Sequence, residues 1–407
     1  MDIRVTFLLI LEALLALWLL YRSGLLTTRR AVIVSVVLTA AAFFLRYLCL
    51  DYQTLDYIDF LSRWVQFYRE LGGFAALDAS VGNYNIPYLY FLAAFSYSGI
   101  SDLYLIKLLS ILFDVLLAYS AMRLVGTVTD RHVPKLVCFF AVLFLPTVIL
   151  NGALWAQCDS IYVALGLTAL WLAMEKRPVA SMVCLALSFG FKLQAVFIIP
   201  VFAVLWMRGD LKLWHFLLFP LTYILLVLPA VLLGRPFADT VLLYFDQAGS
   251  IGSGLNYNSP SVFAFFRSVA NEELAAKLGI AAAFLFMLAV LLLCSVGNRR
   301  LSDRGILAAA LLLAVGIPFL LPHMHDRYFF AADILSVVLA CALPACIPAA
   351  VLTQFASLLG YHAYLKMRYL LPMKDGSVAL LGVLLIALAV LISELRKIFF
   401  KFDEKTY

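Results

Sequence analysis

The chain has 407 residues, of which 65% are hydrophobic and only 13% are charged, and its net charge at pH 7 is +6. A soluble domain is roughly half apolar and about a quarter charged, so this composition excludes an ordinary soluble protein. In a membrane protein the positive balance reflects Lys and Arg in cytoplasmic loops, so no nucleic-acid partner is expected.

Apolar runs long enough to cross a bilayer, which takes about 20 residues, recur from one end of the chain to the other. Helices are the expected form, because lipid offers no partners to backbone groups and no alternating β-barrel segments are seen. The first run, Val5–Leu20, lacks a small-residue cleavage pattern after it and is interpreted as a retained span. At roughly 20 residues per span, the sequence predicts an all-α integral membrane protein with about 13 transmembrane helices. Residues 1–407 are expected to form one polytopic membrane domain.

Clusters of Lys and Arg mark the loops expected on the cytoplasmic side. In chain order these clusters are Arg22, Arg29 and Arg30; Arg123, Arg131 and Lys135; Lys176 and Arg177; Arg208 and Lys212; Arg299, Arg300 and Arg304; and Arg396, Lys397 and Lys401. They agree with one another only if residues 51–102 stay on the outer side. Lys366, Arg368 and Lys374 fall in a loop assigned to the outside and do not fit the rule.

The first external loop, residues 51–102, is expected to hold two surface helices. Asp56–Leu71 places five apolar side chains on one helical face, and Ile86–Tyr97 has only 12 residues, too few for an ordinary span. The five side chains are Ile58, Leu61, Trp64, Val65 and Tyr68. We expect Ile86–Tyr97 to lie on the membrane surface or to be re-entrant. Residues 234–273 form a second large external loop.

Polar residues gather at five places, and the charge rule puts all five on the outer side. Membrane helices commonly end in polar residues, and the His-Met-His-Asp-Arg segment has the alternative role of an interfacial anchor. Two His two residues apart on a loop are poor metal ligands, so neither a metal nor another cofactor is expected. The five places contain Asp51, Asp56 and Asp59; Asn83, Tyr84 and Asn85; Asn151, Trp155, Gln157 and Asp159; Lys192 and Gln194; and His323, His325, Asp326, Arg327 and Tyr328.

Two charges inside an apolar span, Lys107 and Asp114, lie two helical turns apart. Charges within a membrane usually face the bundle interior and pair, so pairing with other residues for packing is expected ahead of the alternative, a direct catalytic role. Lys192 lies near the outer end of a span. It has two possible roles, to extend its amine to the membrane surface or to offer a cation to a phosphate, and its position on the side of the acidic loop favours the second.

Seven segments occur in an order that resembles the GT-C membrane glycosyltransferases, which use a polyprenyl- or dolichyl-phosphate-linked sugar. The nearest likeness is to bacterial proteins described as related to the second GPI mannosyltransferase. The segments extend over about residues 51–330. They are D-Y-I-D-F-L-S-R-W, G-G-F-A-A-L, N-Y-N-I-P-Y-L-Y, L-Y-L-I-K-L-L-S-I-L-F-D, L-P-T-V-I-L-N-G-A-L-W-A-Q-C-D-S, F-G-F-K-L-Q and P-H-M-H-D-R-Y-F.

The resemblance implies that an acidic residue at the start of the first external loop is the general base. Asp56 matches that position, with Asp51 and Asp59 as alternatives, and Asp326 matches the acidic position of the family's external His-acidic motif. It also implies inversion at the sugar, a polyprenyl-phosphate sugar donor (mannose is one possible hexose), and a lipid-linked or cell-surface glycan acceptor. The expected setting is a bacterial plasma membrane with the site facing outward.

The chemistry of such a transfer assigns roles to the remaining candidates. The leaving lipid phosphate needs cationic donors, for which the candidates are Lys192, Arg327, His323 and His325. The other polar residues are expected to contact substrate, and membrane lipids to surround the bundle. These residues are Asn83, Asn85, Trp155, Gln157, Asp159, Gln194, Asp326 and Tyr328.

Two other classes of protein stay open as alternatives. A lipid or solute transporter or flippase would be expected to show a repeated half and charges near the bilayer midplane. A polysaccharide polymerase or ligase would be expected to carry several Arg in one large external loop, whereas residues 234–273 hold only Arg235 and Arg267.

Overall fold

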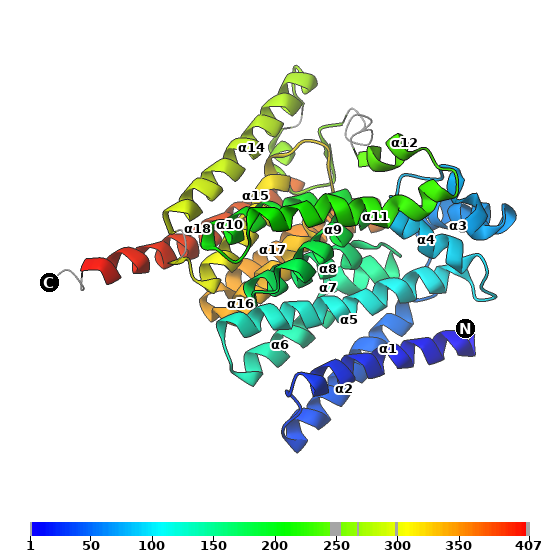
Figure 1. Cartoon of the computed structure of the whole chain (residues 1–407), viewed down its shortest axis with the longest axis horizontal. Coiled ribbons are helices and arrows are strands. Elements are labelled where there is room, and N and C mark those ends of the chain that lie inside the picture. Colours follow the sequence, from blue (N-terminus) through cyan, green and yellow to red (C-terminus); the bar gives the residue numbers. More distant parts are fainter. Residues whose placement is uncertain (1, 245–253, 267, 298–299, 404–407) are drawn as a thin grey trace.

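The computed structural model describes residues 2–244, 254–266, 268–297 and 300–403, and it is 78% helical. The predicted Arg267 and Arg299, and part of the predicted loop 234–273, lie outside the described residues. The helices form one elongated bundle, with α1 and α2 along one side and α14 on the other (Figure 1).

The first half of the chain is helical almost throughout. Two of its turns are π-helical, Tyr57–Leu61 and Leu150–Leu154, and two segments are 3₁₀-helical, Gly73–Asp78 and Leu193–Phe197. Its α-helices are α1 (Ile3–Arg22), α2 (Arg29–Cys49), α3 (Ser62–Glu70), α4 (Ile86–Phe95), α5 (Asp102–Val128), α6 (His132–Leu143), α7 (Pro146–Ile149), α8 (Asp159–Met174), α9 (Pro178–Phe191) and α10 (Pro200–Arg208).

The second half adds the remaining helices and two very short strands. The strands β1 (Asn256–Tyr257) and β2 (Met324–His325) pair in parallel, with Asn256 opposite Met324. The 3₁₀ segments here are Leu213–Leu217, Val262–Phe265 and Pro344–Cys346. The α-helices are α11 (Leu218–Leu232), α12 (Phe237–Val241), α14 (Glu272–Gly297), α15 (Asp303–Leu320), α16 (Phe330–Ala342), α17 (Ile347–Leu365) and α18 (Met373–Asp403).

Among the described residues, eight helices are long and apolar enough to cross a membrane. A ninth span results if α6 and Pro146–Leu154, which meet at a bend of 43°, count as one. The predicted all-α membrane architecture is confirmed at this level. The count of about 13 requires four shorter apolar helices to cross as well, and it stays a prediction: Asp159–Met174, Pro178–Phe191, Leu193–Arg208 and Phe330–Ala342.

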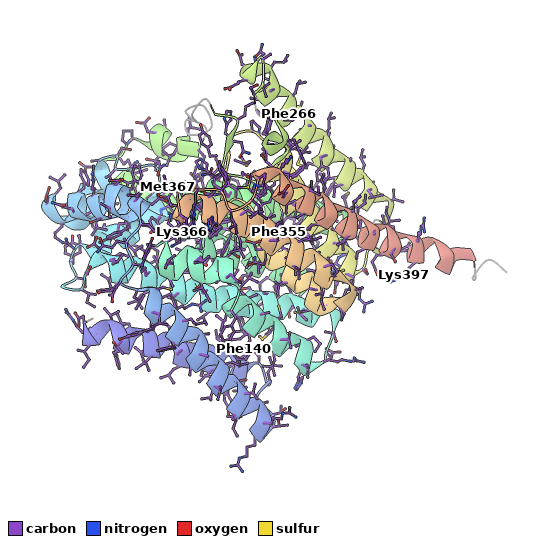
Figure 2. The ribbon with its side chains drawn as sticks, turned by 180° about the vertical axis from the view of Figure 1, so that it is seen from behind. Phe140, Phe266, Phe355, Lys366, Met367 and Lys397 are labelled. Atoms are coloured by element: carbon purple, nitrogen blue, oxygen red, sulfur yellow. The ribbon has the colours of Figure 1, made fainter. Side chains whose placement is uncertain are left out.

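The centre of the bundle is formed by α5 and α15. α15 is 83% buried over its span and α5 is 72% buried, whereas α1 and α14 are each 22% buried. A helix that is hydrophobic all round must be enclosed by protein or lipid, so the peripheral helices present their apolar side chains outward. Phe266 and Phe355, labelled in Figure 2, are two of the exposed apolar side chains.

Both charges inside α5 pair with other residues for packing, as the sequence predicts. Lys107 Nζ donates hydrogen bonds to the carbonyls of Cys49, Leu50 and Tyr52 at 2.6–2.9 Å, so it caps the C-terminal end of α2. Asp114 accepts a hydrogen bond from Arg46 Nε at 3.0 Å, and both side chains are fully buried. These contacts fix where α2 ends and therefore where the loop that carries Asp56 begins.

The two helices expected in residues 51–102 are present as Tyr57–Glu70 and α4. Of the five apolar side chains predicted to share one buried face, four are buried and Ile58 is 45% exposed. The reason is the π-helical turn Tyr57–Leu61, which inserts an extra residue and turns Ile58 out of the face. α4 packs against α3, α9 and α11, with six of its ten residues buried, so other helices enclose it.

Candidate active site

Asp56 is the centre of a hydrogen-bond cluster built from three distant parts of the chain. Its Oδ2 accepts hydrogen bonds from Trp155 Nε1 and Gln157 Nε2, both at 2.8 Å. Its Oδ1 accepts one from the Tyr364 hydroxyl at 2.6 Å. The Asp56 side chain is nevertheless 22% exposed. A carboxylate has about four acceptor positions, so three donors orient it and leave capacity for a proton or a substrate hydroxyl.

Unusual backbone conformations position the donors of this cluster. One π-helical turn begins directly after Asp56 and the other, Leu150–Leu154, ends directly before Trp155. Ala156 has a φ of 66°, in the left-handed region that costs a non-glycine residue about 1–2 kcal/mol. π-turns and strained residues concentrate at functional sites, so these features mark the 150–157 segment as a site element.

Gln157 and Trp155 are each oriented by a contact with a tyrosine. The Tyr84 hydroxyl donates to Gln157 Oε1 at 3.1 Å, which turns the amide nitrogen toward Asp56. Trp155 stacks on Tyr364 with ring centroids 4.2 Å apart and an interplanar angle of 14°. Trp155 and Tyr364, which both donate to Asp56, therefore also stabilise each other and restrict the orientation of the carboxylate.

A second carboxylate, Asp159, lies buried beside the first. It forms a salt bridge with Lys192 and accepts a hydrogen bond from Asn151 Nδ2 at 2.7 Å. Asn151 Nδ2 also donates to the Tyr361 hydroxyl at 3.0 Å. Lys192 Nζ lies 5.7 Å from the centre of the Tyr84 ring, at a distance typical of a cation–π contact. The charge of Lys192 is thus balanced by Asp159 before any ligand binds.

Arg327 lies between the carboxylates without donating a hydrogen bond to any of them. Its Nε is 3.5 Å from Asp159, and its Nη1 is 3.6 Å from Asp326 and 4.0 Å from Asp56. The guanidinium lies over the Trp155 ring, 5.3 Å from its centroid. Within the described residues, the Arg327 Nε–H has no hydrogen-bond acceptor. Burial lowers the pKa of Arg327, but Asp159 and the other groups around it raise the pKa well above its usual value, so Arg327 stays a cation.

The His-Met-His-Asp-Arg segment is anchored to the predicted second external loop. His323 has a φ of 62°, and its Nδ1 lies 2.7 Å from the carbonyl of Gly254. His325 stacks on Tyr257 at 4.7 Å, and burial lowers its pKa to about 4. His325 is therefore neutral at pH 7 and can offer a phosphate only a neutral N–H. Burial raises the pKa of Asp326 to about 7.

Three of the predicted residues make their contacts outside this cluster. Asp51 accepts a hydrogen bond from Tyr104 at 2.7 Å and Asp59 pairs with Arg63 at 3.4 Å, so both bind elsewhere. Asn85 is buried as the N-cap of α4 and donates to the Tyr223 hydroxyl.

Three predicted residues remain, namely Asn83, Gln194 and Tyr328. Asn83 is exposed. Burial raises the pKa of Tyr328, an effect that Gln194 partly offsets, and the Tyr328 ring lies 5.2 Å from that of His325.

Sequence reasoning missed two tyrosines, Tyr361 and Tyr364. They lie in the last turns of α17, three residues apart, so both face the same side of the helix. Their only signal in the sequence is that aromatic residues with a hydroxyl stand at the end of an apolar run, which also describes ordinary interfacial anchors. In Figure 2 the neighbouring Lys366 and Met367 mark this end of α17.

An apolar pocket of about 380 Å³ adjoins the cluster. It shares Tyr361 with the Asp56–Asp159 region and is bounded by the π-turn that leads into Trp155. Its size lies within the range of about 300–1,000 Å³ that is typical of ligand pockets. Its lining is Tyr52, Leu150, Leu154, Leu358, Tyr361, His362, Leu365, Lys366 and Leu370.

The described residues contain no group of three or more His, Cys, Asp or Glu side chains that could hold a metal ion. Comparison with known proteins gives no further guide to the chemistry: no protein-family model matches the chain, and no curated protein is similar to it. The site must therefore be interpreted from its own geometry.

Proposed function

We propose that this protein is an inverting membrane glycosyltransferase of the GT-C kind, which moves a hexose from a polyprenyl-phosphate donor to a lipid-linked or cell-surface glycan acceptor. The observation that carries the proposal is the cluster itself. An oriented, accessible carboxylate stands beside an arginine whose Nε–H has no acceptor among the described residues, and an apolar pocket adjoins the cluster. The proposed setting is a bacterial plasma membrane with the site on the outer face.

Asp56 is the proposed general base. As the acceptor hydroxyl oxygen bonds to the anomeric carbon, its proton passes to Asp56. The bond from that carbon to the phosphate oxygen breaks, and its electron pair leaves with the lipid phosphate. One attack from the face opposite the leaving group inverts the configuration. Trp155, Gln157 and Tyr364 hold the carboxylate in one orientation, which is what a general base needs.

Arg327 is the proposed partner of the leaving phosphate. Guanidinium groups match phosphate oxygens with two parallel donors, and Arg327 already lies within 4.0 Å of Asp56. Lys192 contributes through Asp159, because its salt bridge to that carboxylate balances a negative charge that would otherwise repel the phosphate. The apolar pocket beside Tyr361 is the proposed place for the first isoprene units, and Lys366 stands on its lining.

The test is to purify the full chain in nanodiscs and supply a panel of radiolabelled polyprenyl-phosphate sugars together with a membrane-lipid extract. Transfer of label by the wild type is expected, and Asp56→Asn should lower the rate by at least about 100-fold, the usual contribution of a general base. Asp59→Asn is the matched control, because Asp59 is an exposed carboxylate three residues away, and it should keep the wild-type rate.

Other outcomes of the same experiment have definite meanings. Undiminished transfer by Asp56→Asn would preserve the reaction class and move the base to Asp51 or Asp59. A labelled product that grows by repeated units would support the polymerase or ligase alternative. If no donor is consumed, yet a lipid or solute crosses vesicle membranes, the protein is a transporter or flippase.

A further inference from the structure

A second pocket lies at the end of the bundle opposite Asp56. The Tyr57 hydroxyl bonds to Asp102, the first residue of α5, whereas Val128, the last residue of that helix, lines this second pocket. The 27 residues of α5 span about 40 Å at 1.5 Å per residue, so the two pockets are separated by most of the length of the bundle.

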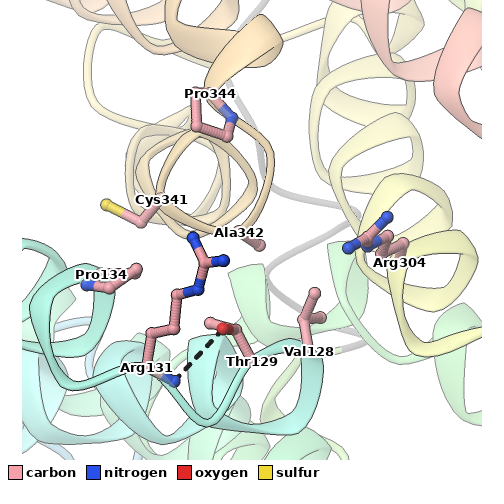
Figure 3. Close-up of a pocket in the computed structure, with 8 residues that line it drawn as sticks. All are labelled: Val128, Thr129, Arg131, Pro134, Arg304, Cys341, Ala342 and Pro344. Carbon is pink, nitrogen blue, oxygen red and sulfur yellow. Dashed lines mark hydrogen bonds between the residues drawn. The ribbon is translucent and has the colours of Figure 1, made fainter.

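The second pocket has a volume of about 360 Å³ and combines two arginines with apolar side chains. Figure 3 shows the Arg131 side chain extending from the α5–α6 connection toward the end of α16, with Arg304 entering from α15. The other lining residues are Val128, Thr129, Pro134, Cys341, Ala342 and Pro344.

Neither arginine is neutralised by a salt bridge or side-chain hydrogen bond within the described residues. The one hydrogen bond of Arg131 here comes from its backbone nitrogen, which donates to Thr129 Oγ1. Arg304 interacts electrostatically with Glu394, but the closer partners of that carboxylate are Ser302 at 2.6 Å and Lys397 at 2.5 Å, and no salt bridge joins it to Arg304 among the described residues.

Several other cations at this end are paired with carboxylates. Arg123 binds Glu175 at 2.8 Å, and Arg208 binds Asp210 at 2.5 Å. An arginine without a partner is common on an ordinary solvated surface. These two guanidinium groups, however, line one pocket, and no acidic side chain is among its lining residues. An anion is therefore the ligand that completes the pocket.

The surroundings of the pocket favour a lipid as the source of that anion. Pro134 lies on α6 beside Val133 and Val137, which are exposed apolar side chains. On the other side, Pro344 leads into α17, where Ile347 and Val351 are also exposed. Exposed aliphatic residues on these helices face lipid, so acyl chains can extend along them from a headgroup held in the pocket.

We propose that this pocket binds the phosphate headgroup of an anionic phospholipid, with Arg131 and Arg304 contacting the phosphate and the exposed faces of α6 and α17 contacting the acyl chains. Basic pockets between transmembrane helices on the cytoplasmic side are suited to such headgroups, and the charge pattern of the loops places this end in the cytoplasm. The proposal is independent of the reaction catalysed at Asp56.

The test counts lipids bound to the full-length protein in a neutral detergent by native mass spectrometry. Dioleoylphosphatidylglycerol and dioleoylphosphatidylcholine are titrated separately. The wild type should bind one phosphatidylglycerol more tightly than phosphatidylcholine. Replacing both arginines, Arg131→Gln with Arg304→Gln, should weaken phosphatidylglycerol binding by about tenfold, because two charge-assisted contacts are lost.

The matched control is Arg29→Gln with Arg30→Gln, which removes the same charge from exposed positions outside the pocket. This control should bind phosphatidylglycerol like the wild type, and an equal loss in both double variants would overturn the proposal. Ala342→Phe fills the pocket and keeps both arginines, so unchanged binding by this variant would overturn it as well. Gel filtration and thermal unfolding confirm that each variant is folded.

Inorganic phosphate provides the final arm of the experiment. If the lipid is the ligand, excess phosphate should leave most of the bound phosphatidylglycerol in place, because acyl-chain contacts add to its affinity. If phosphate alone displaces the lipid and protects the wild type, but not the double variant, against thermal unfolding, the pocket serves a soluble phosphate compound and the lipid assignment is wrong.

Discussion

At the scale of single residues, the site depends on how a few polar side chains share hydrogen bonds. Asp56 has three neutral donors and one nearby cation, whereas Asp159 has a salt bridge with Lys192 and an amide. The difference supports the proposed roles of Asp56 in proton transfer and of Asp159 in charge balance. It follows that substitutions around these two carboxylates should have different effects.

Tyr364→Phe removes one donor to Asp56 and keeps the ring that stacks on Trp155. A hydrogen bond to a charged group is worth about 1.5–3 kcal/mol, so the transfer rate should fall by about tenfold or more. Steady-state kinetics with the labelled donor measure this change. Tyr369→Phe is the control, because that hydroxyl bonds to Asn258 and not to Asp56; equal losses in both variants would contradict an orienting role for Tyr364.

Asp326 makes the stability of the protein depend on pH. Its pKa is about 7 in the folded protein, against about 4 in an unfolded chain, so the folded state binds the proton more tightly between these values. The contribution of Asp326 to the free energy of unfolding is therefore greatest at low pH. It is lost as the pH rises through 7, by about 4 kcal/mol in total. Thermal unfolding at pH 5 and pH 8 should show the fall.

Asp326→Asn should flatten this pH dependence, since the amide does not ionise. Asp59→Asn, at an exposed carboxylate, should leave the fall as it is in the wild type. A pH profile of Asp326→Asn that matches the wild type would show that another group is responsible.

At the scale of elements, α17 and the His-Met-His-Asp-Arg loop approach each other very closely. A Cβ added at Gly360 would lie 2.7 Å from the Asp326 carbonyl oxygen and 2.9 Å from that of Asn258. Because both neighbours are backbone atoms, they can give way only if the loop moves. The glycine thus determines how near α17, with Tyr361 and Tyr364, lies to Arg327.

Gly360→Ala should therefore destabilise the protein by about 1–3 kcal/mol and lower the transfer rate by displacing the loop. Thermal unfolding and the transfer assay measure the two effects. Gly126→Ala is a matched control inside α5, where the new Cβ would meet the Lys135 side chain at an ordinary 3.5 Å. An Ala in that helix should be neutral or slightly stabilising, and similar losses in both variants would contradict the close-approach explanation.

At the scale of the whole molecule, the bundle has two chemically different ends. One end carries the Asp56 cluster and the apolar pocket beside Tyr361, and the other carries the pocket with Arg131 and Arg304. The pattern of Lys and Arg predicts that the first end faces outward. Lys366, in the loop that does not fit this pattern, lines the pocket beside Tyr361.

Cysteine labelling tests the predicted orientation. Asp59→Cys should react with a membrane-impermeant maleimide in intact cells, whereas Arg30→Cys should react only after permeabilisation, because the two positions belong to opposite ends. The wild type sets the background from its seven cysteines. The reverse pattern would place the Asp56 cluster in the cytoplasm.

The sequence by itself determined that this is a helical membrane protein, and it named several of the polar residues that meet in the Asp56 cluster. Apolar runs of span length leave helices as the solution in lipid, and polar residues are too costly there to stand without a partner or a purpose. This logic named Trp155 and Gln157, although as substrate contacts and not as donors to Asp56, and it predicted that Lys107 and Asp114 pair with other residues.

Only the tertiary structure decided which of the three loop aspartates joins the cluster, and which groups neutralise one another. The sequence alone does not distinguish Asp51, Asp56 and Asp59. A π-turn and the left-handed backbone of Ala156 bring only Asp56 to Trp155 and Gln157. Tyr364 is 308 positions away from Asp56 in the chain, and Lys192 forms a salt bridge with Asp159. Contacts between distant segments depend on how whole helices pack, and no local pattern encodes that.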